Sequence, residues 1–364
     1  MKKNICYLVS SLVRCGPSNQ LSYILKYLDK TKYNPIILTL FEEDKNTLKT
    51  HFEQDLNVKV LCLKMKRIDV FLQKPKKINE ILKLHKIDII QTQGVLADYI
   101  SFKKITLDIK KISTIRNYPY HDYPSIFGKH VGYYVAKKHI SIIKKNSENF
   151  IACSKTIMEI FNKELNIKLK YIQNGVDIEK YHPSNNVIDL KKKLNLSENE
   201  KIYISLGSLI PRKDFTTMIN GFKEFNSNKN NLLLIAGNGF ERKQLESISS
   251  NRIIFLGNID NAVEYLQVSD CFISTSLSEG LPNSVLEAMA CALPCILSNI
   301  PSHRELVENE LDGIFFEKKN HKDLSNKLLK TVNNLKNHSE ISLNTIINNH
   351  TAQKMSKGYQ KLYS

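Results

Sequence analysis

Two glutamates with seven residues between them give the strongest chemical signal in the sequence. Glu279 follows the apolar run 271–274, which we expect to be a strand, and Glu287 lies about one turn into a short predicted helix capped by Asn283 or Ser284. The unpaired N–H groups and the positive dipole at a helix start favour a diphosphate, and carboxylates accept hydrogen bonds from vicinal hydroxyls. The segment therefore predicts a site for a sugar carried on a diphosphate. The simpler alternative is a capped helix in which Glu287 only interacts with the dipole.

An adjacent arginine and lysine form the second candidate. Arg212 and Lys213 follow the apolar run 202–206, so we expect them at the carboxyl end of a strand. A planar guanidinium and a point-charged ammonium can neutralise a pyrophosphate leaving group and take the place of a divalent metal. Solvated loop charges are the alternative. The Gly237-Asn-Gly239 turn after the next strand is weaker, because close packing explains it equally well.

Short apolar runs rich in β-branched residues alternate with amphipathic stretches in both halves of the chain, a pattern typical of buried parallel strands joined by crossover helices. Ser18–Leu28 and Pro75–His85 are two such stretches in the first half. Ligands bind at the carboxyl ends of such strands, so two sheets in tandem predict one cleft between two domains. The expected strands are 5–11, 35–41, 58–63, 87–92, 112–115 and 150–154, then 202–206, 232–236, 253–256, 271–274, 294–297 and 314–316. A turn-rich linker is expected between residues 176 and 200, around His182-Pro183-Ser184.

Charge is unevenly distributed along the chain. Residues 1–180 hold 32 Lys and Arg against 17 Asp and Glu, whereas residues 181–364 hold 21 against 19. An excess of positive charge that is confined to the first half of the chain favours an anionic surface or a polyanion as its partner. Paired lysines interleave with apolar residues in the stretch Gly128–Asn146, which could dock on a membrane. Alternatively, Ala136, Ile140 and Ile143 form a stripe buried in the core, and the lysines form the solvent-exposed face of the same helix. The two interpretations are compatible.

The remaining composition limits the class of protein. No tract of about 18 apolar residues offers a membrane span, and Ile5–Ser11 lacks a signal-peptide cleavage site. Seven scattered cysteines favour neither a disulfide framework nor a metal site, and they suggest the reducing cytosol.

At this point the chain resembles a known family, the retaining GT-B glycosyltransferases of family 4. Glu279 to Glu287 matches its E-x7-E signature, and Arg212-Lys213 matches its R-K pair. Similar segments follow in the family's order over nearly the whole chain: Ile112–Pro119, Phe150–Ser154 and the N-G-V-D junction Tyr171–Asp177. The resemblance implies an α/β fold of GT-B type, two tandem Rossmann-like doubly wound domains facing across a cleft. It also implies domains at 1–185 and 186–345, with a last helix within 346–364 that crosses back onto the first domain.

The resemblance also implies roles for individual residues. Glu279 would contact the donor sugar and Glu287 the ribose hydroxyls, while Arg212 and Lys213 would stabilise the departing phosphate. The other implied donor-binding residues are Gly16, Ile259, Gly280, Leu281, Pro282 and Asn283. No metal ligand is implied.

Two positions depart from the family pattern. Many relatives carry His-x-His where this chain has Gln91-Thr92-Gln93, and many carry a histidine where it has Arg116. In the front-face reaction usually described for the family, the leaving phosphate accepts the acceptor's proton, so the loss of a histidine can be tolerated. The acceptor-side candidates are Asp98, Arg116, Asn117 and Asn174.

The resemblance, together with the residue pattern, therefore implies a metal-independent, retaining hexosyltransferase without a cofactor, whose donor is a UDP- or GDP-linked sugar. Its acceptor would be a lipid-linked saccharide or surface polysaccharide, and the enzyme would lie at the anionic inner face of the cell membrane. A polyanion- or nucleic-acid-binding protein is a rival, but no recognition motif is present and nucleic acid is not expected as a partner. An inactive GT-B scaffold is a second rival, and an epimerase or phosphorylase of the same fold is a third.

Overall fold

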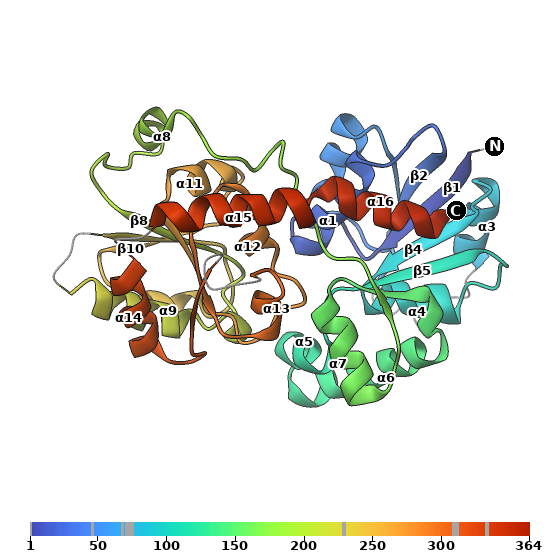
Figure 1. Cartoon of the computed structure of the whole chain (residues 1–364). Coiled ribbons are helices and arrows are strands. Elements are labelled where there is room, and N and C mark those ends of the chain that lie inside the picture. The colour runs from blue at the N-terminus through green and yellow to red at the C-terminus, as the bar shows by residue number, and fades with distance from the viewer. Residues whose placement is uncertain are drawn as a thin grey trace. The chain divides into compact units, whose positions relative to one another are not determined.

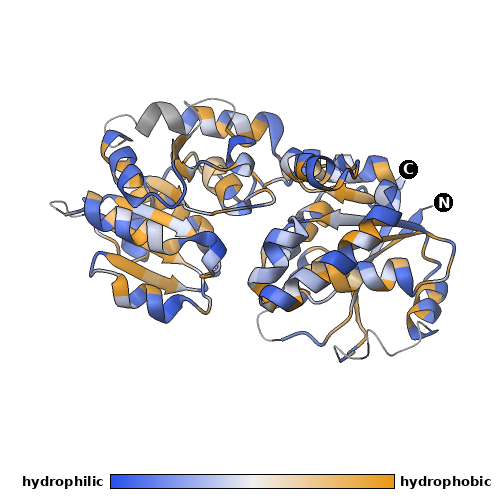
Figure 2. Cartoon of the chain, turned by 90° about the horizontal axis from the view of Figure 1, so that it is seen from below, coloured by the Kyte–Doolittle hydropathy of each residue, from blue (hydrophilic) through white to orange (hydrophobic). Residues whose placement is uncertain are grey.

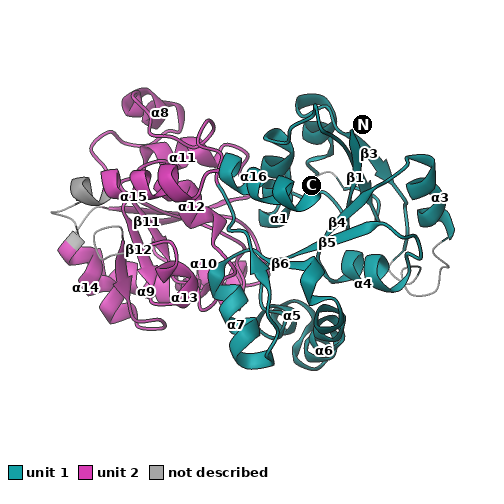
Figure 3. Ribbon diagram, turned by 45° about the vertical axis from the view of Figure 1, so that its right-hand side comes forward, with its two compact units in different colours: residues 1–175, 352–364 teal, residues 176–351 magenta. Residues whose placement is uncertain are grey.

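The computed structural model describes residues 2–44, 47–66, 69, 76–227, 231–307, 313–331 and 335–364. The chain folds into two compact units (Figure 3). Unit 1 comprises residues 1–175 and 352–364, and unit 2 comprises residues 176–351. Each unit is an α/β domain built on one parallel sheet (Figure 1).

The sheet of unit 1 has seven parallel strands in the order β3-β2-β1-β4-β5-β6-β7. The order reverses between the neighbouring strands β1 and β4, and open α/β sheets bind their ligands at such a reversal. The strands are β1 Lys3–Val9, β2 Tyr33–Thr39, β3 Lys59–Cys62, β4 Ile89–Gln93, β5 Lys110–Ile115, β6 Phe150–Ala152 and β7 Lys170–Tyr171. The helices are α1 Gly16–Lys26, α3 Lys76–Leu84, α4 Val95–Lys103, α5 Pro119–Phe127, α6 Lys129–Lys145, α7 Lys155–Leu165 and α16 Ala352–Tyr363, with single turns η1 His51–Asp55 and η2 Ser147–Asn149.

The sheet of unit 2 has six parallel strands in the order β10-β9-β8-β11-β12-β13, and its order reverses between β8 and β11. The strands are β8 Ile202–Leu206, β9 Leu232–Ala236, β10 Ile253–Gly257, β11 Cys271–Ser274, β12 Cys295–Ser298 and β13 Ile314–Phe316. The helices are α8 Val187–Lys193, α9 Phe215–Phe225, α10 Arg242–Ile248, α11 Ala262–Val268, α12 Asn283–Ala290, α13 Pro301–Arg304, α14 His321–Thr331 and α15 Leu335–Asn349, with the single turn η3 Pro211–Lys213.

The apolar strands form the core of each unit, as their sequence pattern predicts. Figure 2 shows hydrophobic strands covered by helices in which hydrophobic and hydrophilic residues alternate. All twelve expected strands are present, with ends displaced by a few residues in several cases, and β7 is a further strand that the pattern missed. Both residues of β7 are exposed, so no apolar run marks it. The expected linker is also partly helical, because α8 forms within it.

The units divide at different residues from those predicted. Unit 1 ends at Gly175 and not at residue 185 because the following segment belongs to unit 2, where Tyr181 is buried and its side chain hydrogen-bonds to Glu287. Unit 2 extends to Thr351 and not to 345, which lies inside α15. Its two ends pair with each other, since the Val176 N–H donates to the His350 carbonyl at 2.9 Å. The last helix therefore begins at Ala352.

Helix α16 belongs to unit 1, and its side chains are the hydrogen-bond partners of buried polar residues on β4 and β5. It packs against α1, and its Ser356 hydroxyl donates to the Ile24 carbonyl at 2.8 Å. Tyr359 and Tyr363 are fully buried: the Tyr359 hydroxyl lies 3.0 Å from that of Thr114, and the Tyr363 hydroxyl donates to Gln91. Gln91 therefore serves as an internal acceptor for the C-terminal helix.

Within the described ranges, no helix is long and apolar enough to cross a bilayer.

Candidate active site

The candidate catalytic residues of unit 2 lie where its strand order reverses. Arg212 and Lys213 form the single turn after β8, and Glu279 lies on the loop after the neighbouring strand β11. Pro211 begins the turn, and Asp214, in a left-handed conformation, ends it and caps α9 by accepting the Thr217 N–H. Parallel strands place these two loops at one edge of the sheet, so residues far apart in sequence meet there.

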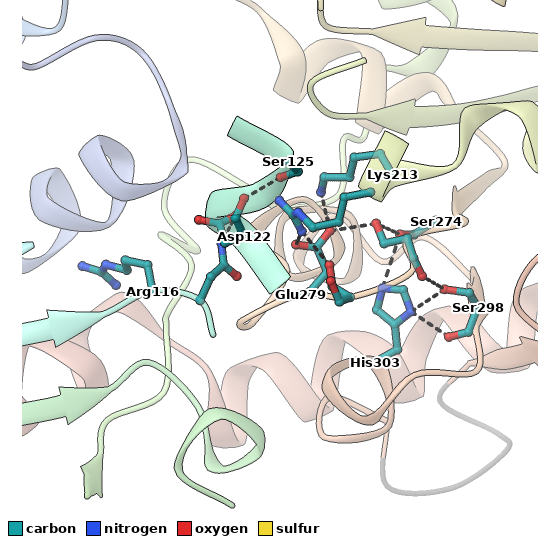
Figure 4. A network of polar contacts seen from close by, with 12 residues as sticks. Arg116, Asp122, Ser125, Lys213, Ser274, Glu279, Ser298 and His303 are labelled. Carbon is teal, nitrogen blue, oxygen red and sulfur yellow. Dashed lines mark hydrogen bonds and ion pairs between the residues drawn. The ribbon is translucent and has the colours of Figure 1, made fainter. Parts of the chain in front are cut away.

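The structure brings the three predicted catalytic residues into contact. Arg212 Nη1 lies 2.7 Å from Glu279 Oε2, and Lys213 Nζ lies 2.5 Å from Glu279 Oε1. The Glu279 side chain is 7% exposed, and those of Arg212 and Lys213 are 14% and 16% exposed. Figure 4 shows Lys213 and Glu279 pointing toward each other from their two loops. One carboxylate thus holds two cations side by side and leaves the trio with one net positive charge.

The charges around Glu279 decide its protonation state. Burial alone would raise the pKa of this carboxyl, but Arg212 and Lys213 outweigh burial and hold its pKa well below the usual range. Glu279 is therefore ionised throughout the physiological pH range. A permanently charged carboxylate serves as an acceptor and as an anchor for cations, and it is not suited to donate a proton.

A second layer of side chains fixes the Glu279 loop. The Ser276 hydroxyl donates to Glu279 Oε1 at 2.7 Å, and the Leu277 N–H donates to the Arg212 carbonyl at 2.8 Å. Beneath them, His303 is fully buried between Ser274 and Ser298 (Figure 4). The two loops are thus tied together through backbone and side chains.

His303 was not anticipated from the sequence. Burial lowers the pKa of His303 to about 4, so the ring is neutral at physiological pH. Its Nδ1 lies 2.8 Å from the Ser298 carbonyl, which can only accept, so Nδ1 carries the hydrogen. The only sequence signal was a lone histidine shortly after an apolar strand, which is too common to assign a role.

Helix α12 begins beside the Glu279 loop, but it is not capped as predicted. Pro282 is its N-cap and Asn283 its first residue, so neither Asn283 nor Ser284 caps it. Gly280, Leu281 and Pro282 form the turn into the helix and are buried. The N-cap Pro282 has no side-chain oxygen and makes no side-chain cap hydrogen bond.

Glu287 lies inside α12 and has an environment opposite to that of Glu279. It is buried, and burial raises its pKa to about 7, although Lys180 and a hydrogen bond to Tyr181 act in the other direction. The two glutamates of the signature therefore differ in charge at neutral pH: Glu279 is ionised and Glu287 is near half-protonation.

The glycines after β8 and β9 allow two loops to approach each other. A Cβ on Gly237, whose φ is +135°, would lie 1.9 Å from the Gly207 carbonyl oxygen, and one on Gly239 would lie 2.2 Å from that of Leu209. The Lys213 side chain passes over Gly207, with Cε 3.5 Å from the position of a Cβ. Loop packing therefore accounts for Gly237 and Gly239.

Two further donor-binding predictions fall at strand ends. Ile259 is half-buried directly after β10 in unit 2. Gly16 is the first residue of α1, after β1 in unit 1. Both positions are at carboxyl edges of their own sheets, where ligands of such folds bind.

Arg116 organises the acceptor-side candidates of unit 1. It follows β5, and its Nε and Nη2 donate to Gln93 Oε1 at 3.2 and 2.9 Å, while Nη1 donates to Asn174 Oδ1 at 2.7 Å. The Gln93 amide in turn donates to the Pro17 carbonyl at 3.2 Å, at the start of α1. Arg116 is half-buried, and no carboxylate among the described residues is within ion-pair distance of it.

The other two acceptor-side candidates have local partners. The Asn117 amide lies 3.3 Å from Asp122 at the start of α5. Asp98 is 1% exposed and accepts from Thr92, from Ser113 at 2.6 Å and from His139 Nε2 at 2.8 Å. Both its oxygens are engaged inside unit 1, so its position does not support the prediction that Asp98 contacts the acceptor.

Comparison with known proteins matches each unit to a family of glycosyltransferases. The family described as Glycosyltransferase Family 4 matches residues 16–180, and the one described as Glycosyl transferases group 1 matches residues 186–347. A UDP-Gal:alpha-D-GlcNAc-diphosphoundecaprenol alpha-1,3-galactosyltransferase from Escherichia coli is 34% identical over 202 residues, which are 50% of this chain and 52% of the relative. The alignment thus spans about half the length of that protein. An O-antigen biosynthesis glycosyltransferase, WclY of Escherichia coli, is 26% identical over 89% of this chain and 91% of its own.

Solved structures share the fold over the whole chain. A glycosyltransferase from Rickettsia africae has a TM-score of 0.80 at 20% identity, covering 100% of this chain and 98% of its own. Anabaena HepE, solved in complex with UDP and glucose, has a TM-score of 0.82 at 18% identity, with 99% of both chains covered. The two matched family regions and the sequence relatives show that the chain belongs to family 4 of the glycosyltransferases. The solved structures show that it has the GT-B fold.

Proposed function

We propose that the protein is a retaining hexosyltransferase that moves a sugar from a UDP- or GDP-linked donor to a lipid-linked saccharide, without a metal ion. The contact of Arg212 and Lys213 with Glu279 carries the proposal, because it concentrates two cations at the strand-order reversal of unit 2. An anionic diphosphate is the ligand that such a pair beside a helix start favours.

In the proposed reaction, an acceptor hydroxyl attacks the anomeric carbon as the bond from that carbon to the diphosphate oxygen breaks. The electron pair leaves on the diphosphate, which also takes the hydroxyl proton, and the nucleoside diphosphate is the second product. Arg212, Lys213 and the N–H groups at the start of α12 stabilise the charge that develops on the leaving group. Glu279 keeps both cations in place and accepts from a sugar hydroxyl, and Glu287 accepts from the ribose.

The comparisons support this choice of substrates. The Escherichia coli relative is named for transfer from UDP-galactose to a diphosphoundecaprenol-linked sugar, and a Campylobacter jejuni relative, 36% identical over 30% of this chain, is named for another diphospho-undecaprenol acceptor. Anabaena HepE has been solved in complex with UDP-glucose. A lipid-linked acceptor requires the enzyme to work at a membrane, and the proposed place is the cytoplasmic face.

The direct test is a transfer assay with UDP- and GDP-hexoses in EDTA, using diphospholipid-linked monosaccharides as acceptors. We expect one donor to support transfer in EDTA and the product to keep the anomeric configuration of the donor, read by NMR. An inverted product would refute retention, and full dependence on added metal would refute metal independence. Absence of both transfer and donor hydrolysis across the panel, with the protein folded, would refute the activity.

Arg116 supports an anionic acceptor. Among the described residues, the side-chain partners of this half-buried guanidinium are the neutral amides of Gln93 and Asn174, so it keeps its full charge. Leaving such a charge without a counterion is costly. Its fork matches a phosphate oxygen pair, and its bonds to Gln93 and Asn174 hold it in one orientation. We therefore assign Arg116 to the diphosphate of the acceptor.

Replacing Arg116 by glutamine tests this assignment. We expect Arg116→Gln to raise the KM for a diphospholipid-linked acceptor about tenfold, the effect of one lost charge-assisted hydrogen bond. The KM for the same sugar on an uncharged octyl chain should not change. Measuring both acceptors with each enzyme separates the effects, and an equal loss with both would show that Arg116 only supports the fold.

A further inference from the structure

Large apolar side chains gather on the surface of unit 1 where α5 meets α6. Five exposed large apolar residues lie between positions 126 and 134, and we call them the apolar tip. Their exposed fractions run from 40% for Phe127 to 63% for Tyr134. The five are Ile126, Phe127, Val131, Tyr133 and Tyr134. Such clustering differs from the scattered single apolar residues that are normal on a soluble surface.

The charge around the apolar tip has one sign. No Asp or Glu occurs between Tyr123 and Asn146, a stretch with five lysines, Lys129, Lys137, Lys138, Lys144 and Lys145. All five are exposed, and none forms an ion pair with a residue in the described ranges. Lys138 Nζ lies over the Tyr134 ring, 5.3 Å from its centroid. An apolar patch bordered by cations is complementary to a bilayer interface, whose acyl region is apolar and whose lipid headgroups are anionic.

The core stripe and the basic face proposed from the sequence coexist in α6. Ala136, Ile140 and Ile143 are buried, while Lys137 and Lys138 are exposed beside them. The stripe thus fastens the helix to unit 1 and leaves the lysines and the tip available. Burial of the stripe therefore does not compete with docking.

The α5–α6 hairpin is held as one rigid piece. A Cβ on Gly132 would lie 2.4 Å from Pro124 Cα, so only glycine permits the close crossing of the two helices. Below it, the Tyr123 hydroxyl lies 2.6 Å from His139 Nδ1, and His139 Nε2 lies 2.8 Å from Asp98 Oδ2. Because a carboxylate only accepts, Nε2 carries a hydrogen, and the tyrosine hydroxyl can donate to Nδ1. This buried chain ties α5 and α6 to α4 and gives Asp98 its place in the fold.

We infer that the apolar tip inserts into the interface of an anionic lipid bilayer, with the α6 lysines on the headgroups. This inference rests on the proposed function, since it names the surface by which the enzyme reaches a lipid-linked acceptor. A second copy of the chain is a poorer occupant, because pairing two tips would bring like-charged lysines together. Arg116 lies three residues before the start of α5 at Pro119, so the residue assigned to the acceptor diphosphate is close in the chain to the docking hairpin.

The test measures sedimentation of the full-length protein with phosphatidylcholine vesicles, with and without phosphatidylglycerol. Wild type should bind only the anionic vesicles, and more weakly as salt is added. Two variants address the two components: Phe127→Ser/Tyr134→Ser removes apolar area, and Lys137→Glu/Lys138→Glu reverses charge. Each should weaken binding at least about tenfold. Leu84→Ser, which removes a 76% exposed leucine of α3 outside the tip, should bind as wild type does.

The vesicle and turnover experiments distinguish failure of the docking surface from failure of the proposed transferase function. The docking surface would be overturned if wild type did not bind the vesicles, or if the two double variants bound them as tightly as wild type does. A change of oligomeric state in the tip variants, seen by analytical ultracentrifugation, would assign the tip to self-association. Turnover on a short water-soluble acceptor should be the same in all variants. If the vesicle results hold but no variant or wild type shows turnover, the docking surface stands and the proposed function fails.

Discussion

Arg212→Ala should lower kcat by about 10² to 10³, with a smaller change in the KM for the donor. The guanidinium is held on Glu279 before the donor arrives, so no reorganisation is needed when charge develops on the diphosphate. The guanidinium therefore stabilises the transition state more than the bound donor, so its loss should lower kcat. Steady-state rates at saturating donor and acceptor measure it.

Arg212→Lys is the matched variant, because it keeps the charge and removes the planar fork. We expect it to recover part of the lost rate. Glu279 should keep a low pKa in both variants through Lys213, so the loop should remain folded, which thermal unfolding can check. Wild-type kcat in Arg212→Ala would remove this residue from the leaving-group site.

Glu287→Gln should change how stability depends on pH. The folded-state pKa of Glu287 is about 7, above its ordinary value of 4.5. The folded protein therefore holds this proton more tightly than the unfolded chain, and the associated stability is present below about pH 4.5 and lost as pH rises through 7. Glutamine has no proton to lose, so between pH 5 and 8 the variant should gain on the order of 3 kcal/mol relative to wild type.

Urea unfolding of both proteins at pH 5 and pH 8 measures this difference. Glutamine can still accept from Tyr181, so the packing of the site is preserved. The same variant should bind the nucleoside diphosphate about tenfold more weakly, because a neutral amide accepts less strongly from ribose hydroxyls than a carboxylate. Parallel pH profiles for wild type and variant would show that Glu287 is not the group that titrates.

The sequence pattern was sufficient for both sheets because buried parallel strands are continuous apolar runs. It missed β7, whose two residues, Lys170 and Tyr171, are exposed. It also placed the unit boundary too late, since the assignment of Tyr181 to unit 2 depends on a contact with Glu287 over a hundred residues away. Local periodicity carries no information about such partners.

The candidate site was predicted as a set of residues but not as a set of contacts. Spacing placed Arg212, Lys213 and Glu279 at strand ends, and the resemblance to the family assigned Glu279 to the sugar and both cations to the phosphate. The structure pairs all three directly. Gln91 shows the same limit: in the sequence it was only a departure from the family pattern, whereas in the structure it accepts from Tyr363 at the far end of the chain. Such roles become visible only when the fold brings distant segments together.

The central claim is that Arg212, Lys213 and the start of α12 bind the diphosphate of the donor. Calorimetric titration of UDP and GDP into wild type and into Arg212→Ala/Lys213→Ala, in EDTA, tests it most directly. The account predicts that wild type binds one of the two nucleotides and that the double variant, still folded, binds it at least about tenfold more weakly. Equal affinity in the two proteins, or no binding of either nucleotide by wild type, would contradict it.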